Sequence, residues 1–130
     1  MEVAVDCVIV AEGRIALIKR KNEPFKDCYA FPGGFVEDED LKSAAARELK
    51  EETGLTDITL KQFKAYGAPD RDPRGRVITI VFSGELNSIQ ELESATDAKE
   101  AQWFALDDLP PLAFDHKKIL KEFLEEVIRI

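Results

Sequence analysis

The sequence predicts an α/β fold in which two helices cover the faces of one sheet. Three β-branched, largely apolar segments are typical of strands and span residues 3–10, 14–20 and 76–86. Two further segments have the apolar spacing of helices, residues 40–53 and a final one that Asp115 is expected to cap. At 130 residues the chain has the length of one domain, so residues 1–130 are expected to form a single domain.

Shorter elements are expected between these segments. The dipeptide Glu12-Gly13 predicts a turn that joins the first two strands into a hairpin. Alternating apolar residues predict further strands at residues 29–31, 57–66 and 101–104, the last with Trp103 in the core. Proline, glycine or acidic residues predict loops at residues 21–27, 67–75 and 87–98.

The composition excludes several classes of partner. A net charge of −8 argues against nonspecific binding to nucleic acids or membrane surfaces, since both are polyanions. We expect no membrane span and no secretory signal, and therefore a cytoplasmic location. Cys7 and Cys28 are expected to be reduced residues rather than a disulfide or a metal pair.

The segment 40–53 carries an unusual arrangement of acidic residues. Glu48, Glu51 and Glu52 stand at positions i, i+3 and i+4, so their carboxylates project from one side of about one helical turn. Such a face is usually solvated, and its like charges repel one another. A divalent cation would reverse that repulsion, because hard ions such as Mg²⁺ favour carboxylate oxygens.

The surrounding residues resemble the Nudix box, G-x5-E-x7-R-E-U-x-E-E-x-G-U, in which U is a bulky aliphatic residue. The nine matching positions are Gly33, Glu39, Arg47, Glu48, Leu49, Glu51, Glu52, Gly54 and Leu55. Family members usually count the box from the second glycine of the pair, whereas here the count begins at Gly33. We interpret this as a one-residue shortening of the loop after Val36.

The resemblance implies a Nudix-type α/β/α sandwich with a mixed β-sheet, and a hydrolase that uses Mg²⁺ or Mn²⁺. It implies that Glu48 and Glu52 are the main metal ligands, that Glu51 is a further ligand, and that a carbonyl of Gly33 or Gly34 completes the set. Arg47 would orient a box carboxylate through charge-assisted hydrogen bonds. The candidates for the general base are Glu51, Glu93, Asp97 and Glu100.

A second stretch, Tyr66 to Val77, resembles a segment of ADP-ribose pyrophosphatases and of ADP-ribose-sensing Nudix regulators. Arginines there can order the loop through Asp70 and Asp72, or they can grip a pyrophosphate. The candidate substrate contacts are Arg20, Arg71, Arg74 and Arg76. His116, the single histidine, is expected in a helix N-terminal turn or on the surface.

We therefore expect a metal-dependent ADP-ribose pyrophosphatase that acts on a small-molecule nucleotide and gives AMP and ribose 5-phosphate. One alternative is hydrolysis of another nucleotide sugar or of a nucleoside triphosphate. A different alternative is a sensor that binds ADP-ribose without cleaving it. Those relatives carry a DNA-binding winged helix and often lose box glutamates, whereas Glu48, Glu51 and Glu52 are present here. Family members are commonly dimers, so a homodimer is one expected assembly.

Overall fold

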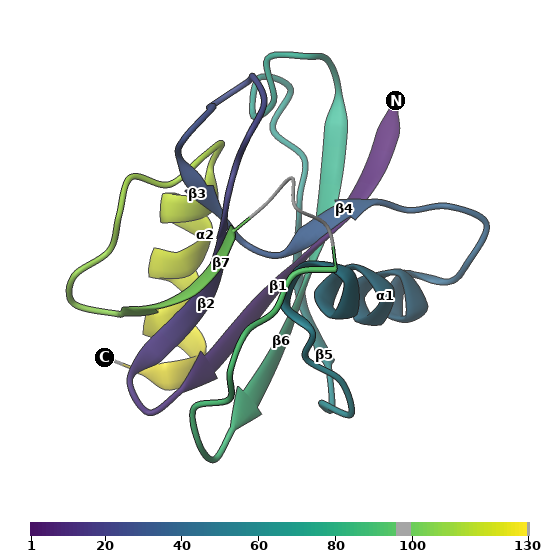
Figure 1. Ribbon diagram of the computed structural model, residues 1–130. Coiled ribbons are helices and arrows are strands. Elements are labelled where there is room, and N and C mark those ends of the chain that lie inside the picture. The colour runs from purple at the N-terminus through teal and green to yellow at the C-terminus, as the bar shows by residue number, and fades with distance from the viewer. Residues whose placement is uncertain (96–99, 130) are drawn as a thin grey trace.

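The computed structural model describes residues 1–95 and 100–129 and has three layers (Figure 1). In this part of the chain, seven strands form one mixed sheet. Helix α1, Leu41–Thr53, lies against one face, and helix α2, His116–Phe123, lies against the other. The expected α/β/α sandwich is confirmed.

The strands are β1 (Glu2–Ala11), β2 (Arg14–Lys19), β3 (Tyr29–Ala30), β4 (Gly33–Phe35), β5 (Lys61–Tyr66), β6 (Val77–Leu86) and β7 (Glu100–Ala105). The sheet order is β3-β2-β1-β6-β5, while β4 pairs with β1 and β7 pairs with β2. Strands β1 and β6 run parallel over their whole length, and the other pairs are antiparallel. The sheet is therefore mixed, and β1 lies at its centre.

The side chains of β1 alternate between two cores. Val5, Cys7 and Ile9 belong to the apolar cluster on the α1 side of the sheet. Val8 and Val10 belong to the cluster on the α2 side. Successive strand side chains point to opposite faces, so a strand buried on both faces needs a nearly continuous apolar run. This explains why the predicted strand at residues 3–10 is so uniformly apolar.

Helix α1 has a clear signal at each end. The Asp40 side chain accepts a hydrogen bond from the Ser43 N–H, 2.8 Å away, and so caps the helix. Gly54 adopts the left-handed conformation with φ +78°, and its N–H donates to the carbonyl of Lys50. These two residues fix where the helix begins and ends, and therefore where its glutamates lie.

Helix α2 begins differently from the prediction. Asp115 stands at the N-cap position, but its carboxylate makes no capping hydrogen bond. It accepts two hydrogen bonds from Arg71 instead, at 3.0 and 2.8 Å. A buried guanidinium requires a charged partner, and this requirement takes precedence over capping. The helix continues into a π-helical segment, Leu124–Ile128.

Two strand predictions need correction. The strand predicted over residues 57–66 begins only at Lys61, and Asp57 has a positive φ of 60°, which interrupts an extended chain. Gly33 and Gly34, for which no strand was predicted, belong to β4, in which Ala4 pairs with Phe35 and Asp6 pairs with Gly33. The hydrogen bonds to β1 that create β4 come from residues far away in the sequence.

The placement of Trp103 and of the two cysteines bears on two further expectations. Trp103 is half-buried rather than fully enclosed, and its indole N–H donates to the carbonyl of Gln90. Cys7 and Cys28 are free thiols, and burial raises the pKa of Cys7 above its ordinary value.

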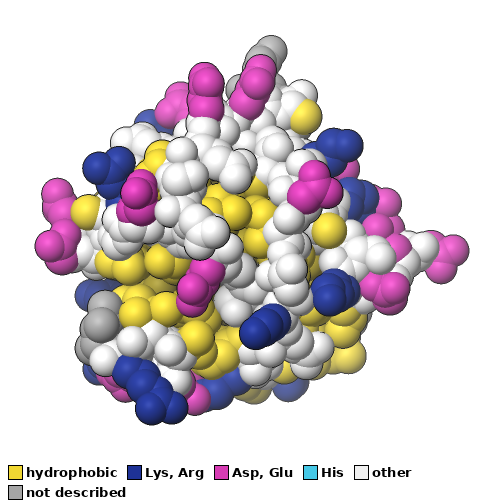
Figure 2. Space-filling view, turned by 90° about the horizontal axis from the view of Figure 1, so that it is seen from below, with side chains coloured by type: hydrophobic (Ala, Val, Ile, Leu, Met, Phe, Trp, Pro, Cys, Tyr) yellow, Lys and Arg dark blue, Asp and Glu magenta, His cyan; other side chains and the backbone are white. Residues whose placement is uncertain are grey.

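Figure 2 shows one face on which acidic and basic side chains are interspersed around apolar surface, with no continuous basic patch among its described residues. None of the helices in residues 1–95 and 100–129 is long and apolar enough to span a membrane.

Candidate active site

Helix α1 brings two glutamates against the backbone of β4. Glu52 is 3% exposed, and its Oε1 accepts a hydrogen bond from the N–H of Gly33 at 2.7 Å. A Cβ atom added to Gly34 would lie 2.6 Å from both Cδ and Oε1 of Glu48. The absence of a side chain at Gly34 therefore lets Glu48 approach this strand, while Glu52 binds the strand through a backbone N–H.

Arg47 connects the residues on this side of the helix. Its Nε lies 3.0 Å from each carboxylate oxygen of Glu39, and its Nη1 donates to Oε1 of Glu48 at 2.8 Å. Its Nη2 also donates to the carbonyl of Phe35 at 3.3 Å. The nearest oxygen of Glu51 is 3.5 Å from Nη1. Arg47 thus fixes two carboxylates and attaches the helix to β4.

The acidic residues differ in their electrostatic environment. Burial, together with the negative charge of Glu52, raises the pKa of Glu48 above its ordinary value, and Arg47 opposes this rise. The hydrogen bond from Arg47 lowers the pKa of Glu39. The side chain of Glu51 is about half exposed and does not share this confinement. Glu48 and Glu52 are therefore held close together at an electrostatic cost.

The donor chemistry of this cluster fits a hard divalent cation, which binds to carboxylate and carbonyl oxygens. In the part of the chain that the structure describes, no three acidic, histidine or cysteine side chains are already arranged to hold a metal ion. The carboxylates instead bind Arg47 and the N–H of Gly33. A cation would relieve the repulsion between Glu48 and Glu52, so the residues fit the metal in chemistry, but their present side-chain geometry does not converge on one.

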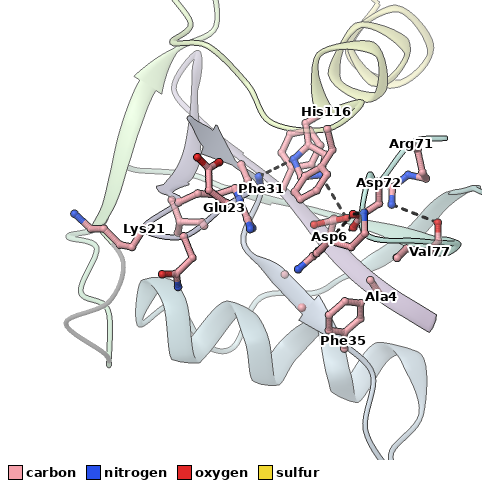
Figure 3. Close-up of a pocket in the computed structure, with 18 residues that line it drawn as sticks. Ala4, Asp6, Lys21, Glu23, Phe31, Phe35, Arg71, Asp72, Val77 and His116 are labelled. Carbon is pink, nitrogen blue, oxygen red and sulfur yellow. Dashed lines mark hydrogen bonds and ion pairs between the residues drawn. The ribbon is translucent and has the colours of Figure 1, made fainter. Parts of the chain in front are cut away.

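A pocket of about 300 Å³ opens beside β4 (Figure 3). In this view Asp6, Phe31 and His116 lie together above β4, whereas α1 lies below the strand. Gly33 and Gly34 line the pocket and also contact the glutamates of α1. The strand is therefore the wall shared by the glutamate cluster and the pocket.

Three of the four candidate arginines line this pocket, namely Arg20, Arg71 and Arg74. Arg71 is 8% exposed and is paired with Asp115. Arg74 donates to both carboxylate oxygens of Asp72. The fourth, Arg76, is outside the pocket lining and donates to the carbonyl of Gly67 at 3.1 Å.

Arg20 and Arg74 place two positive charges near one another. Burial, followed by the charge of Arg74, lowers the pKa of Arg20, and the acidic groups nearby offset part of this effect. Arg20 is held by a 2.7 Å hydrogen bond from its Nε to the carbonyl of Pro24. An anion in the pocket would stabilise both guanidinium groups.

The pocket contains two polar residues, His116 and Asp6, that the sequence did not assign to a site. His116 is in the first turn of α2, as expected, and it is 2% exposed rather than on the surface. Its Nδ1 accepts a hydrogen bond from the N–H of Phe31, and its Nε2 lies 3.6 Å from Oδ2 of Asp6. Asp6 is the single polar residue in the apolar strand predicted at residues 3–10, and this isolated position was the signal in the sequence that could have identified it as a pocket residue.

The candidate general bases lie at different places. Glu93 is beside the end of α1, where its N–H donates to the carbonyl of Thr53. Glu100 forms a 2.8 Å ion pair with Lys21, and this interaction lowers the pKa of Glu100. Asp97 lies outside the described residues. Glu51 remains on the exposed side of α1, 3.5 Å from Arg47.

Fold and site together define a Nudix-type domain, in which a helix carrying glutamates packs beneath a mixed sheet. The NUDIX domain family model matches residues 1–126. The chain therefore belongs to the Nudix family, and it is a Nudix hydrolase.

The individual relatives have related descriptions. The chain is 53% identical, over 94% of its length and 72% of the relative's, to an ADP-ribose pyrophosphatase of Methanocaldococcus jannaschii. It is 32% identical to the ADPR responsive transcriptional repressor NtrR of Acinetobacter baylyi, over 94% of this chain and 51% of that protein. The NUDIX domain of Shewanella oneidensis NrtR, solved in complex with ADP ribose, superposes with a TM-score of 0.91 at 28% identity, over 98% of this chain and 88% of that one.

Proposed function

We propose that this Nudix hydrolase cleaves the pyrophosphate of ADP-ribose, giving AMP and ribose 5-phosphate, with Mg²⁺ or Mn²⁺ as cofactor. The observation that carries the substrate is the 53% identity to an ADP-ribose pyrophosphatase over 94% of the chain. The glutamate cluster and the arginine-lined pocket, which share the wall β4, support the same reaction. The pyrophosphate would lie near Gly33 and Gly34, where the cluster and the pocket meet.

The metal would be held chiefly by Glu48 and Glu52, with Glu51 and a carbonyl of Gly33 or Gly34 as further ligands. When bound, it would neutralise phosphate charge and activate water, since the negative charge of a pyrophosphate repels a nucleophile. Arg47 would keep Glu48 facing the strand, because its guanidinium also binds Glu39 and the carbonyl of Phe35.

The arginines divide into two groups by their surroundings. Arg20 and Arg74 would bind phosphate oxygens, because their neighbouring positive charges favour an anion between them. Arg71 and Arg74 are both paired with a carboxylate, but the side chain of Arg71 is only 4% exposed while that of Arg74 is 45% exposed. Arg71 would therefore order the loop rather than reach the substrate. Arg76, outside the pocket lining, would contact only a part of the substrate that extends beyond the pocket.

The proton-accepting group would come from the acidic residues around the end of α1. Glu93 is held there by its backbone hydrogen bond to Thr53, and Glu51 shares the same helix as the proposed ligands. Glu100 is less available, because Lys21 holds its carboxylate. Asp97 is still a candidate general base, on the grounds of the sequence alone.

A sensor that binds ADP-ribose without cleaving it is the second candidate, since the chain also matches an ADPR responsive repressor. The 32% identity to that repressor is lower than the 53% identity to the pyrophosphatase. Another nucleotide sugar or a nucleoside triphosphate is a further alternative as substrate. Turnover, rather than binding, distinguishes these candidates.

The test is to incubate the protein with ADP-ribose and Mg²⁺ or Mn²⁺, beside a panel of nucleotide sugars and nucleoside triphosphates, and to measure AMP by chromatography. We expect AMP to form from ADP-ribose with either metal and none to form with EDTA. Tight binding of ADP-ribose without turnover would support the sensor instead. Preferred cleavage of another compound would replace ADP-ribose as the substrate.

The variant Glu52→Gln tests the metal ligand assignment. We expect it to lose nearly all turnover, because an amide oxygen carries no negative charge, while the melting temperature changes little. Glu125→Gln is the matched control, since it makes the same change on an exposed residue at the opposite side of the sheet. Full activity of Glu52→Gln would refute the assignment.

Three broader expectations are also proposals. We propose that residues 1–130 work as one Nudix domain, that the protein acts in the cytoplasm, and that two copies form a homodimer. Sedimentation equilibrium measures the assembly directly, and fractionation of cells that express the protein measures its location.

A further inference from the structure

The segment between β6 and β7, residues 87–95, is held by contacts from elements that are far away in the sequence. The N–H of Ile89 donates to the carboxylate of Glu12 at the β1–β2 turn, 3.3 Å away. The carbonyl of Gln90 accepts a 2.7 Å hydrogen bond from the indole N–H of Trp103 on β7. The segment has no helix or strand of its own, so these contacts determine where it lies.

The same segment completes the end of helix α1, which it passes in Figure 1. The last carbonyls of a helix have no partner within the helix. The carbonyl of Glu51 accepts a hydrogen bond from the N–H of Ala95, at 2.8 Å. The carbonyl of Thr53 accepts one from the N–H of Glu93, also at 2.8 Å. A Cβ atom added to Gly54 would lie 2.9 Å from the carbonyl oxygen of Glu93, so the close approach requires a glycine at this position.

This docking forms a groove beside α1. Its lining includes Arg47 and Glu51 from the helix, and Glu93 and Ser94 from segment 87–95. Glu51 is a proposed metal ligand and Glu93 is a candidate general base, so two acids with proposed roles in the reaction border one groove. Their relative position depends on the contacts that hold the segment against the helix.

Trp103 is the residue by which the sheet holds this segment. It pairs with Ala16 of β2, and its ring packs against the same apolar cluster as Leu92 of the segment. The indole N–H is the only polar group of this side chain, and it can only donate. Its 2.7 Å bond to the Gln90 carbonyl is at the short end of the range for N–H···O hydrogen bonds. The packed ring therefore sets the direction of the N–H, and the N–H holds Gln90.

We propose that Trp103 is a positioning residue for the reaction, because its indole N–H holds segment 87–95 against the end of α1 and so keeps Glu93 beside Glu51. Trp103 acts through this segment, since it lines neither the groove nor the arginine-lined pocket. The inference rests on the proposed function, because it takes Glu93 as the group that accepts the proton of the attacking water. It also explains the residue type, since phenylalanine could pack against the cluster but could not hold the carbonyl.

A purely structural role for Trp103 is the competing explanation. In that case the loss of the N–H lowers the stability of the fold and leaves the activity of the folded protein unchanged. Positioning predicts a lower kcat with a nearly unchanged KM and melting temperature. The KM is expected to hold because the residues that line the arginine-lined pocket come from outside segment 87–95.

The experiment compares Trp103→Phe with the wild type by AMP release from ADP-ribose at saturating Mg²⁺. We expect kcat to fall about 5- to 30-fold, because one hydrogen bond is lost and Glu93 is displaced. We expect KM to stay within about twofold. Gln90→Ala is the matched control, since it removes an exposed side chain at the other end of the bond but keeps the backbone carbonyl that accepts it. It should keep wild-type kcat.

A double mutant tests whether Trp103 acts through Glu93. We expect Glu93→Gln to lower kcat strongly, because an amide cannot accept the proton. Residues that act as a unit have non-additive effects, so adding Trp103→Phe to Glu93→Gln should lower kcat by less than about twofold further.

Amide hydrogen exchange, measured by NMR, tests the docking without turnover. The N–H groups of Glu93 and Ala95 bond to carbonyls of α1, so their exchange reports how often the segment leaves the helix. We expect both amides to exchange about fivefold faster in Trp103→Phe than in the wild type, as the loss of one hydrogen bond predicts. The amides of β1 serve as the internal reference and should not change.

Three results would overturn the inference. These are wild-type kcat in Trp103→Phe, an equal fall in kcat with and without Glu93→Gln, and unchanged exchange at Glu93 and Ala95. Where Trp103→Phe fails to fold, the same measurements are made with 3-benzothienylalanine at position 103, which keeps the bicyclic ring and has sulfur in place of the N–H. A wild type without turnover would refute the proposed function itself, whereas an active wild type with an equally active variant refutes only the role of Trp103.

Discussion

The contact between β4 and the helix predicts that Gly34→Ala separates catalysis from folding. The added Cβ atom would lie 2.6 Å from Cδ and Oε1 of Glu48 and 2.8 Å from Oε2. An ordinary contact begins at 3.4 Å, so the carboxylate has to retreat by about 0.8 Å. Gly34 is part of a strand and does not have a positive φ, so alanine is compatible with the backbone there.

A displacement of this size is large for a metal ligand. Misplacing a catalytic group by about 1 Å costs about 100-fold in rate, and we expect a fall of that order in kcat. The assay is AMP release from ADP-ribose at saturating Mg²⁺, together with a melting curve. Arg47 resists the retreat, since it holds Glu48 at 2.8 Å, so the displacement cannot be absorbed without breaking that bond or moving β4.

The matched control is Gly67→Ala. Its added Cβ atom would meet Cγ1 of Ile78 at 3.3 Å, which is close to an ordinary contact, and its three nearest neighbours are all atoms of Ile78. We expect it to keep wild-type kcat. Wild-type kcat in Gly34→Ala, with an unchanged melting temperature, would show that the position of Glu48 does not matter to the reaction. A loss of activity that only follows unfolding would also refute the reasoning.

Two other variants test the ion pairs of the site. Arg47→Ala removes the group that opposes the high pKa of Glu48, so the pKa of Glu48 rises further and the acidic limb of the activity profile moves to higher pH. A profile of kcat/KM against pH measures this, and an unmoved limb would contradict it. Arg71→Ala leaves the carboxylate of Asp115 without its buried partner, so we expect a loss of about 3–5 kcal/mol in the free energy of unfolding. Denaturant unfolding measures the loss, and a change below about 1 kcal/mol would show that Arg71 is not structural.

The elements predicted most accurately were those with local signals. Helix α1 required only the Asp40 cap, the Gly54 terminator and an apolar stripe, all of which are close together in the chain. The strands β1, β2 and β6 followed from β-branched apolar runs that are buried on the sheet. Strand β4 was missed because its two glycines have no strand signal, and only pairing with β1 makes them extended.

The pocket illustrates the same limit. Asp6, Gly33 and His116 are distant from one another in the sequence and meet only because β1, β4 and α2 converge. The sequence predicted that Asp115 caps the final helix, but its carboxylate binds the guanidinium of Arg71, which comes from a loop far away in the sequence. Local rules cannot foresee such competition, because the competing partner is supplied by the tertiary fold.

The sequence by itself determined the helix and the order of its glutamates, because helical spacing alone places Glu48 and Glu52 on one side of a turn. Only the tertiary structure decided what that side faces. It placed Gly33 and Gly34 against the two carboxylates and gave the same strand a second role as the wall of a pocket. The physical reason is that a strand without side chains can be approached closely from both faces, and no property of the local sequence specifies which groups will approach it.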